Sequence, residues 1–344
     1  MPPLREFSLE PILWYNRIFW LFLKSGKDCF SLNRMNLSLR FEGNTLAGFA
    51  AILLWSTTIA VVRSLSEQVG GLTAAVSVYL IGGLFCLLRL RCRGKADGTL
   101  RLLPFRYLCG CGALFVFYML VLYLAVGTAK SRQQVLEVGL LNYLWPALTI
   151  VFSLFLLNKK SGPLLFPGAI LAVAGIVFVL GQEVSISWRS MTENFAGNPV
   201  AYSFGLLAAI SWALYSNLTR RWAGGSGGAV EIFIPATGVI LLGLRFFSPE
   251  TGSWTLRAGL EAIFLGIVTV VAYILWDRAM RKGDVVLVAA FSYLTPLFST
   301  IVSCLYLGLI PGASLWFGCA MIIAGSVLSW RSISEVDTSK ASKP

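Results

Sequence analysis

The sequence predicts an all-α integral membrane protein with ten transmembrane helices, built as two inverted five-helix repeats. Three observations support this fold class. The 344 residues are 57% hydrophobic and 13% charged, with a mean hydropathy of +0.76, whereas soluble domains are about half apolar and a quarter charged. The apolar residues form about ten long runs. Finally, the two halves of the chain share motifs at a nearly constant spacing.

Each apolar run approaches the length of about 20 residues that a helix needs to cross the hydrocarbon core of a bilayer. The alternating pattern of membrane β-strands is absent from the sequence. The runs cover residues 46–65, 72–90, 104–126, 133–157, 163–181, 199–221, 230–247, 258–280, 284–309 and 313–330. The fourth and ninth runs contain Pro146 and Pro296, and proline removes a helical hydrogen bond. We therefore expect these two helices to bend or break.

The distribution of cations predicts the orientation. Ten spans place both termini on one side, and the loops and tail of that side hold sixteen lysines and arginines, against six in the other loops. Lysine and arginine collect on the cytoplasmic side, so both termini are predicted to be cytoplasmic. This pattern also explains the net charge of +12 without nucleic-acid binding.

No metal site or cofactor is predicted. The chain has no histidine, and its seven cysteines form no CxxC pair, which disfavours both zinc and a disulfide framework. The sequence also lacks phosphate-binding and nucleophile motifs in a strand–turn–helix context. An integral membrane enzyme is therefore a weaker hypothesis than a transporter or a structural scaffold.

The first 41 residues precede the apolar runs and are treated as an N-terminal extension. Their apolar patch, Ile12 to Leu23, is interrupted by Asn16 and Arg17 and is too short to span a membrane. One interpretation is an amphipathic interfacial helix. The preferred interpretation is that translation begins at Met35.

The internal repeat supplies the strongest functional indication. Residues 142–146 (NYLWP) align with residues 292–296 (SYLTP), and Trp55 aligns with Trp212. Since each half has five spans, the second half must enter the membrane from the opposite face. Inverted repeats are typical of secondary transporters, whose solute site lies near the midplane between the repeats. We therefore expect residues 42–181 and 199–331 to be the two repeats, joined by an extracytoplasmic linker at 182–198 and followed by a cytoplasmic tail at 332–344.

Several side chains within the runs are candidates for function. Trp55, Trp145 and Trp212 lie near the middle of their runs, where an interfacial aromatic belt explains them less well, and their alternatives are a solute cavity, packing between helices or contact with lipid. Further aromatic candidates for a cavity wall are Tyr118, Tyr123, Tyr215, Tyr273 and Trp276. Glu137 and Asp277 are carboxylates in apolar runs, and such groups either serve transport or form ion pairs. Lys130 and Arg132 are candidate partners for Glu137, and Arg278 and Arg281 for Asp277.

These motifs resemble the drug/metabolite transporter superfamily, and within it the EamA-domain members of the YddG type, which export aromatic amino acids. The resemblance rests on residues 54–56 (LWS), 137–146 (EVGLLNYLWP), 276–280 (WDRAM) and 292–296 (SYLTP), and it covers about residues 42–331. It implies a monomeric transporter of the bacterial inner membrane that exports aromatic and other neutral amino acids from the cytoplasm. Export of cationic or aromatic drugs is the alternative.

The resemblance also implies a central cavity lined by aromatic residues of both halves, with no cofactor. Together with the amide in the first proline motif, the expected solute-binding residues are Trp55, Tyr118, Asn142, Tyr143, Trp145, Trp212 and Tyr293. Pro146 and Pro296 are the expected hinges of the gating helices. The partners expected are an amino acid and the lipid bilayer.

Overall fold

The structure is a computed structural model that describes residues 42–93, 103–180, 188–224, 227–307 and 313–335. Contacts divide the chain into two units, Met1–Gly43 and Asn44–Pro344, and the helix bundle belongs to the second. The apolar patch Ile12 to Leu23, Met35 and most of the C-terminal tail lie outside the described residues. The hypotheses about the start of the chain therefore stay open.

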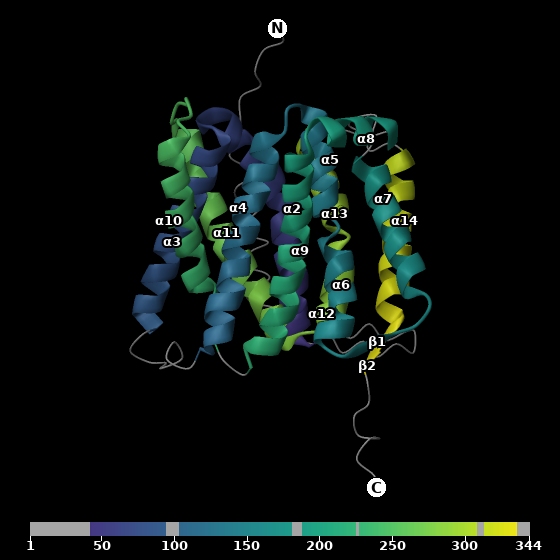
Figure 1. Ribbon diagram of the computed structural model, residues 1–344. Coiled ribbons are helices and arrows are strands. Elements are labelled where there is room, and N and C mark those ends of the chain that lie inside the picture. Colours follow the sequence, from purple (N-terminus) through teal and green to yellow (C-terminus); the bar gives the residue numbers. More distant parts are fainter. Residues whose placement is uncertain (1–41, 94–102, 181–187, 225–226, 308–312, 336–344) are drawn as a thin grey trace. The chain divides into compact units, whose positions relative to one another are not determined.

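The described part of the chain is almost entirely helical (Figure 1). The helices are α2 (Gly43–Val69), α3 (Gly71–Arg93), the π-helix η2 (Arg106–Cys111) continuing into α4 (Gly112–Thr128), α5 (Arg132–Asn142), α6 (Trp145–Leu156), α7 (Leu165–Leu180), α8 (Trp188–Gly197), α9 (Pro199–Trp222), α10 (Val230–Phe247), α11 (Leu256–Lys282), α12 (Val285–Ser292), α13 (Thr295–Leu307) and α14 (Ala313–Arg331). Two short strands, β1 (Lys159–Ser161) and β2 (Ile333–Glu335), pair antiparallel with Lys159 opposite Glu335.

Among the described residues, six helical segments are long and apolar enough to cross a bilayer. They are Gly71–Cys92, Arg106–Thr128, Gln133–Leu156, Pro199–Trp222, Val230–Phe247 and Leu256–Lys282. Helix α2 makes a seventh if its two parts, which meet at 43°, count as one span. The shorter helix α7 is also apolar over Leu165–Val179. The chain is therefore an all-helical, multi-pass membrane protein.

Hydrogen bonds between helix ends show that α2 and α9 run in opposite directions. Arg278 Nε, near the end of α11, donates to Asn44 Oδ1 at the start of α2, at 2.9 Å. Arg220 Nη1, near the end of α9, donates to the carbonyl oxygen of Arg281 at 2.6 Å. The start of α2 and the end of α9 thus lie at the same end of the bundle. These are the helices that carry the sequence-related residues Trp55 and Trp212.

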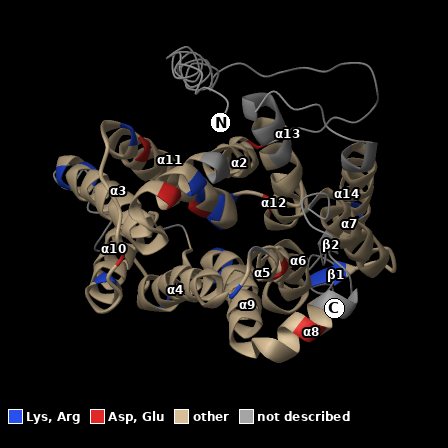
Figure 2. Ribbon diagram, turned by 90° about the horizontal axis from the view of Figure 1, so that it is seen from above, with Lys and Arg blue, Asp and Glu red and all other residues tan. Residues whose placement is uncertain are grey.

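Glycines let α7 and α14 approach to backbone contact, and both ribbon views place these helices side by side (Figures 1 and 2). A Cβ atom built at Gly175 would lie 2.7 Å from the Gly318 carbonyl oxygen, and one at Gly325 would lie 2.5 Å from the Gly168 carbonyl oxygen. Small residues at such spacing are what close helix pairs in membranes require. Each of these contacts joins a glycine of one half to a glycine of the other.

Helix α3 packs in the same manner against α10 and α11. A Cβ atom built at Gly83 would lie 3.0 Å from Pro235 of α10, and one at Gly82 would lie 3.1 Å from the carbonyl oxygen of Gly266 in α11. Arg89 of α3 also pairs with the buried Glu231 of α10, with 2.6 Å between Nε and Oε1. The two halves are therefore joined along both flanks of the bundle.

At the opposite end of α3, the loop after α10 caps the first turn of this helix. The Glu250 carboxylate accepts hydrogen bonds from the N–H groups of Leu72 and Thr73 at 2.9 and 2.8 Å, and from the Thr73 hydroxyl. Partial burial opposes ionisation of Glu250. These hydrogen bonds and the charge of Arg245 outweigh it, so the pKa of Glu250 is lowered below 4.5.

The glycine contact between α7 and α14 predicts the effect of Gly325→Ala. The added methyl group would lie 2.4 Å from the backbone nitrogen of Ala172, so the helices must separate, at a cost of about 1–3 kcal/mol. Gly259→Ala in α11 is the matched control, because its Cβ would meet nothing within 4 Å. Thermal unfolding in detergent should show a lower Tm for Gly325→Ala and an equal or higher Tm for Gly259→Ala. Equal melting temperatures for wild type and Gly325→Ala would contradict this packing.

The Glu250 cap predicts a pH dependence. Because the pKa of this carboxyl group is lower in the folded protein than in the unfolded chain, its stabilisation is complete above the unfolded-state value of about 4.5 and is lost as the pH falls through the folded-state value. The Tm difference between wild type and Glu250→Gln should be constant above about pH 5 and should shrink below it. A difference that grows on acidification would contradict the cap.

Candidate solute-binding site

Trp212, near the midpoint of α9, is the centre of a cluster of aromatic side chains. Its ring centroid lies 5.8 Å from that of Trp55 in α2, 4.7 Å from that of Tyr118 in α4 and 6.4 Å from that of Trp145 in α6. All three neighbours come from the first half of the chain, whereas Trp212 comes from the second. Trp55 and Trp212 occupy equivalent positions of the internal repeat, so the two halves contact each other through the indole rings of equivalent residues.

Helix α11 completes the cluster from the second half. The Trp276 ring stacks on Trp212 at 5.9 Å with an interplanar angle of 28°, and it lies 5.2 Å from Trp55 and 5.3 Å from Trp145. Tyr273, one turn earlier, lies 5.4 Å from Trp55 and 5.7 Å from Trp212. Such aromatic pairs contribute about 0.5–1.5 kcal/mol each beyond the burial of their area. We call the six residues Trp55, Tyr118, Trp145, Trp212, Tyr273 and Trp276 the aromatic cluster.

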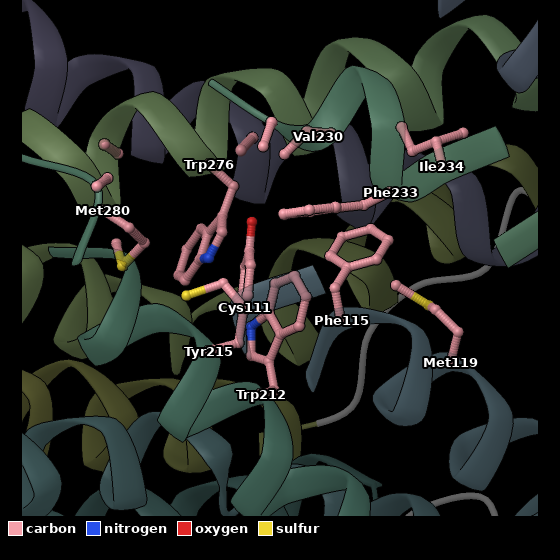
Figure 3. Close-up of a cluster of buried hydrophobic side chains, with 14 of the residues drawn as sticks. Cys111, Phe115, Met119, Trp212, Tyr215, Val230, Phe233, Ile234, Trp276 and Met280 are labelled. Carbon is pink, nitrogen blue, oxygen red and sulfur yellow. The ribbon is translucent and has the colours of Figure 1, made fainter. Parts of the chain in front are cut away.

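The members of the aromatic cluster differ in exposure. Trp276 is fully buried, and Trp212 and Trp145 are buried with 2% and 6% of their surface exposed. Trp55, Tyr118 and Tyr273 are only partly buried. The cluster therefore has a closed side formed by Trp145, Trp212 and Trp276 and an accessible edge formed by the other three rings. Figure 3 shows Trp276, Trp212, Tyr215 and Phe115 pointing toward one another on the closed side.

Two helix breaks lie next to the aromatic cluster, at equivalent positions of the two halves. Tyr143 and Leu144 separate α5 from α6, and Tyr293 and Leu294 separate α12 from α13. Leu144 N–H donates to the Leu141 carbonyl oxygen at 3.1 Å, and Leu294 N–H donates to the carbonyl oxygen of Phe291 at 3.0 Å. These tight turns keep the backbone hydrogen-bonded, which a break at membrane depth requires.

The prolines follow these breaks directly. Pro146 lies in the first turn of α6 and Pro296 is the second residue of α13, where the N–H that proline lacks would have no helical partner in any case. The expectation that the fourth and ninth runs bend or break is confirmed. The function of Pro146 and Pro296 as hinges remains a prediction.

The carboxylate of Glu137, at the middle of α5, is fully buried in a hydrogen-bond network. It accepts from the Tyr202 hydroxyl of α9, from the amide of Asn194 in α8 at 3.1 and 3.2 Å, and from the amide of Gln133 at 3.0 Å. Lys130, one of the partners considered from sequence, donates instead to the Gly197 carbonyl oxygen at 3.0 Å. The side chain of the other, Arg132, lies outside the described residues. The network ties α5 to α8 and α9.

Asp277 is 1% exposed and forms an ion pair with Arg281, with 2.7 Å between Oδ2 and Nε. Its other oxygen accepts from the Tyr107 hydroxyl at 2.5 Å, and that hydroxyl accepts from the N–H of Ala229 at 3.1 Å. Arg278, the other cation considered as a partner, bonds to Asn44 instead. Both oxygens of this buried carboxylate thus have strong donors within the protein.

The chain is similar in sequence to a family of known proteins. The model of the EamA-like transporter family matches residues 44–181 and again residues 199–331. The chain belongs to this family. Its two matched segments are the two parts that contribute to the aromatic cluster.

Two curated relatives that cover most of this chain share one functional name. The aromatic amino acid exporter YddG of Salmonella typhimurium is 34% identical over 287 residues, which cover 83% of this chain and 96% of the relative. The exporter of the same name from Escherichia coli K12 is 31% identical with the same coverage. A crystal structure aligns with a TM-score of 0.70 and 29% identity over 83% of this chain and 96% of the other. EamA-like proteins are transporters and not enzymes.

The structure of this EamA-like transporter brings together four of the seven residues proposed for solute binding, namely Trp55, Tyr118, Trp145 and Trp212. Asn142 lies beside Tyr118 at the edge of the cluster. Tyr143 and Tyr293 lie at the helix breaks and pack in a neighbouring apolar cluster with Ile150 and Val286. Whether solute contacts these two tyrosines remains a prediction.

Sequence reasoning missed Phe115, whose ring lies 6.0 Å from that of Trp212 and 5.0 Å from that of Tyr273. The available signal was its position three residues before Tyr118, because residues three apart share a helix face. Tyr123, considered for the cavity, instead packs against the apolar contact of α3 with α10.

The Glu137 network predicts different effects for two buried tyrosines. Tyr202→Phe removes a donor from a buried carboxylate, so we expect a loss of about 1–3 kcal/mol of unfolding free energy. Tyr293→Phe is the matched control, because the Tyr293 hydroxyl is buried and has no hydrogen-bond partner among the described residues. Denaturation of the purified proteins in detergent should show a lower stability for Tyr202→Phe only. If both variants lost the same unfolding free energy, the hydrogen bond from Tyr202 to Glu137 would make no measurable contribution to stability.

Proposed function

We propose that this EamA-like protein exports aromatic amino acids, and other neutral amino acids, from the cytoplasm by alternating access. The observation that carries the proposal is the aromatic cluster, in which rings of both halves surround Trp212. Stacked and edge-on rings suit a planar solute by burial and by aromatic geometry. The names of the relatives, which describe aromatic amino acid exporters, support the same solute class.

The proposed architecture has ten spans in two inverted repeats, residues 42–181 and 199–331. Three features support it. Helices α2 and α9 run in opposite directions, the helix breaks recur in both halves, and α7 and α14 meet through glycines of both halves. In this architecture α5 with α6, and α12 with α13, are single broken spans, and α8 belongs to the linker at 182–198. One chain then holds both repeats and acts as a monomer.

The proposed orientation places both termini in the cytoplasm of a bacterial cell, with the protein in the inner membrane. The end of the bundle where α2 begins also holds Arg220, Arg278 and Arg281, and the paired strands β1 and β2 hold Lys159. Cations of this density favour the cytoplasmic side. In that orientation the aromatic cluster lies between this basic end and the α8 end, near mid-membrane, where inverted-repeat transporters bind their solutes.

Open space beside the cluster supports a cavity. Tyr118 and Tyr273 lie deep in the bundle, yet each keeps accessible surface. A Cβ atom at Gly139, one turn before Tyr143 on α5, would meet no atom within 4 Å. We infer that the cavity lies between α4, α5 and α11, bordered by the aromatic cluster. Movement at the breaks before Pro146 and Pro296 would open it to either side.

Export of planar cations is a second candidate function, because the faces of the same rings attract ammonium and other cationic groups. The two functions differ in the solute that the protein must carry. Cells that overproduce the protein should gain resistance to a planar cationic dye such as ethidium only under the second.

Flux through purified protein in liposomes tests the proposal. Vesicles loaded with radiolabelled tryptophan should release it faster than protein-free vesicles. Trp145→Ala removes a ring that contacts both Trp212 and Trp276, so the initial rate should fall about tenfold. Trp316→Ala is the control, because this tryptophan is 59% exposed on α14. If the wild type carried no amino acid, the proposal would be overturned. A structural scaffold would then be the better interpretation.

A further inference from the structure

We infer that the indole N–H of Trp276 binds the carboxylate of the transported solute and thereby selects amino acids over amines. The inference rests on the proposed function, since it assumes that the aromatic cluster receives the solute. It assigns one polar, specificity-determining contact within the aromatic cluster. The sequence indicated Trp276 only as a further aromatic candidate for the cavity wall, without this polar role.

The indole N–H of Trp276 is a buried donor without an acceptor. Trp276 is 0% exposed, and its Nε1 atom has no hydrogen-bond partner among the residues that the structure describes. Nearly all buried polar groups in proteins are paired, so an unpaired one calls for a specific explanation. The indole N–H groups of Trp212 and Trp145 belong to the same cluster. Neither of them combines full burial with the lack of a hydrogen-bond partner.

The nearest carboxylate in the sequence does not satisfy this donor. Asp277 directly follows Trp276, but its Oδ2 accepts from Arg281 and its Oδ1 from Tyr107. The bond to Tyr107 holds Asp277 toward η2. Trp276 instead turns its ring toward Trp55, Trp145 and Trp212, and Figure 3 shows it beside Tyr215 and Trp212.

The chemistry of the donor selects the ligand. An indole N–H donates and cannot accept, so it gains nothing from an ammonium group. It gains most from an anionic oxygen, because hydrogen bonds to ionised acceptors are stronger than neutral ones. A solute that combines an aromatic ring with a carboxylate therefore matches both the rings and the donor. An aromatic amine matches the rings alone.

Competition in proteoliposomes tests the assignment. Tryptophan flux is measured in the presence of indole-3-propionate, which has the ring and the carboxylate, or tryptamine, which has the ring and the ammonium group. Trp276→Phe keeps a ring but removes the donor. We expect the KM of tryptophan and the Ki of indole-3-propionate to rise about tenfold to a hundredfold, and the Ki of tryptamine to stay within about twofold of wild type. Equal changes in the two Ki values, or none, would overturn the inference.

The matched control is Trp145→Phe, which makes the same ring change in the same cluster without removing a buried, unpaired donor. The ratio of the two Ki values should stay at its wild-type value. If Trp276→Phe does not fold, the wild type alone still decides. Indole-3-propionate should then inhibit about tenfold more strongly than its uncharged amide, and equal inhibition would overturn the inference. A wild type that carries no tryptophan would overturn the proposed function instead.

Discussion

Contact between helix backbones at glycine is the constraint on which the rest of this structure depends. In a bilayer the hydrophobic effect does not drive helices together, so close packing must do so. Gly168, Gly175, Gly318 and Gly325 bring α7 and α14 to backbone contact, and Gly82 and Gly266 do the same for α3 and α11. Each of these contacts crosses from one half to the other. The halves are thereby fixed at a distance at which Trp55 and Trp212 meet.

The helices at the centre of the bundle pack differently from those at its flanks. Small residues close the flanks, whereas the aromatic cluster holds α2, α6, α9 and α11 apart by the width of indole rings. Helices that are spaced by large rings can separate without loss of backbone hydrogen bonds. The glycine-packed pairs lack this freedom. Movement during transport should therefore concentrate at α5, α6, α12 and α13 and leave the pairs α3 with α10 and α7 with α14 intact.

Composition and periodicity were sufficient to predict a multi-pass helical protein, and proline chemistry was sufficient to predict two helix breaks. They could not show which aromatic residues meet. Tyr118 and Phe115 lie in one apolar run, and only the packing of α4 on α9 shows that both contact Trp212. The partners of Glu137 were equally hidden, because Tyr202 and Asn194 are distant in sequence. Nearby cations were the natural expectation, yet Lys130 bonds to a carbonyl oxygen.

The polar groups of the bundle interior divide by whether the protein satisfies them. Asp277 accepts hydrogen bonds from Arg281 of its own helix and from Tyr107 of η2, and Glu137 accepts one from Tyr202 of α9. Such groups stabilise one arrangement of helices. The Trp276 N–H and the Asn142 Oδ1 atom are buried without partners among the described residues, and each belongs to the aromatic cluster or borders it. Groups of this kind are costly in a protein that binds nothing. In a transporter their cost is offset when the solute arrives, because the solute supplies the missing hydrogen-bond partner.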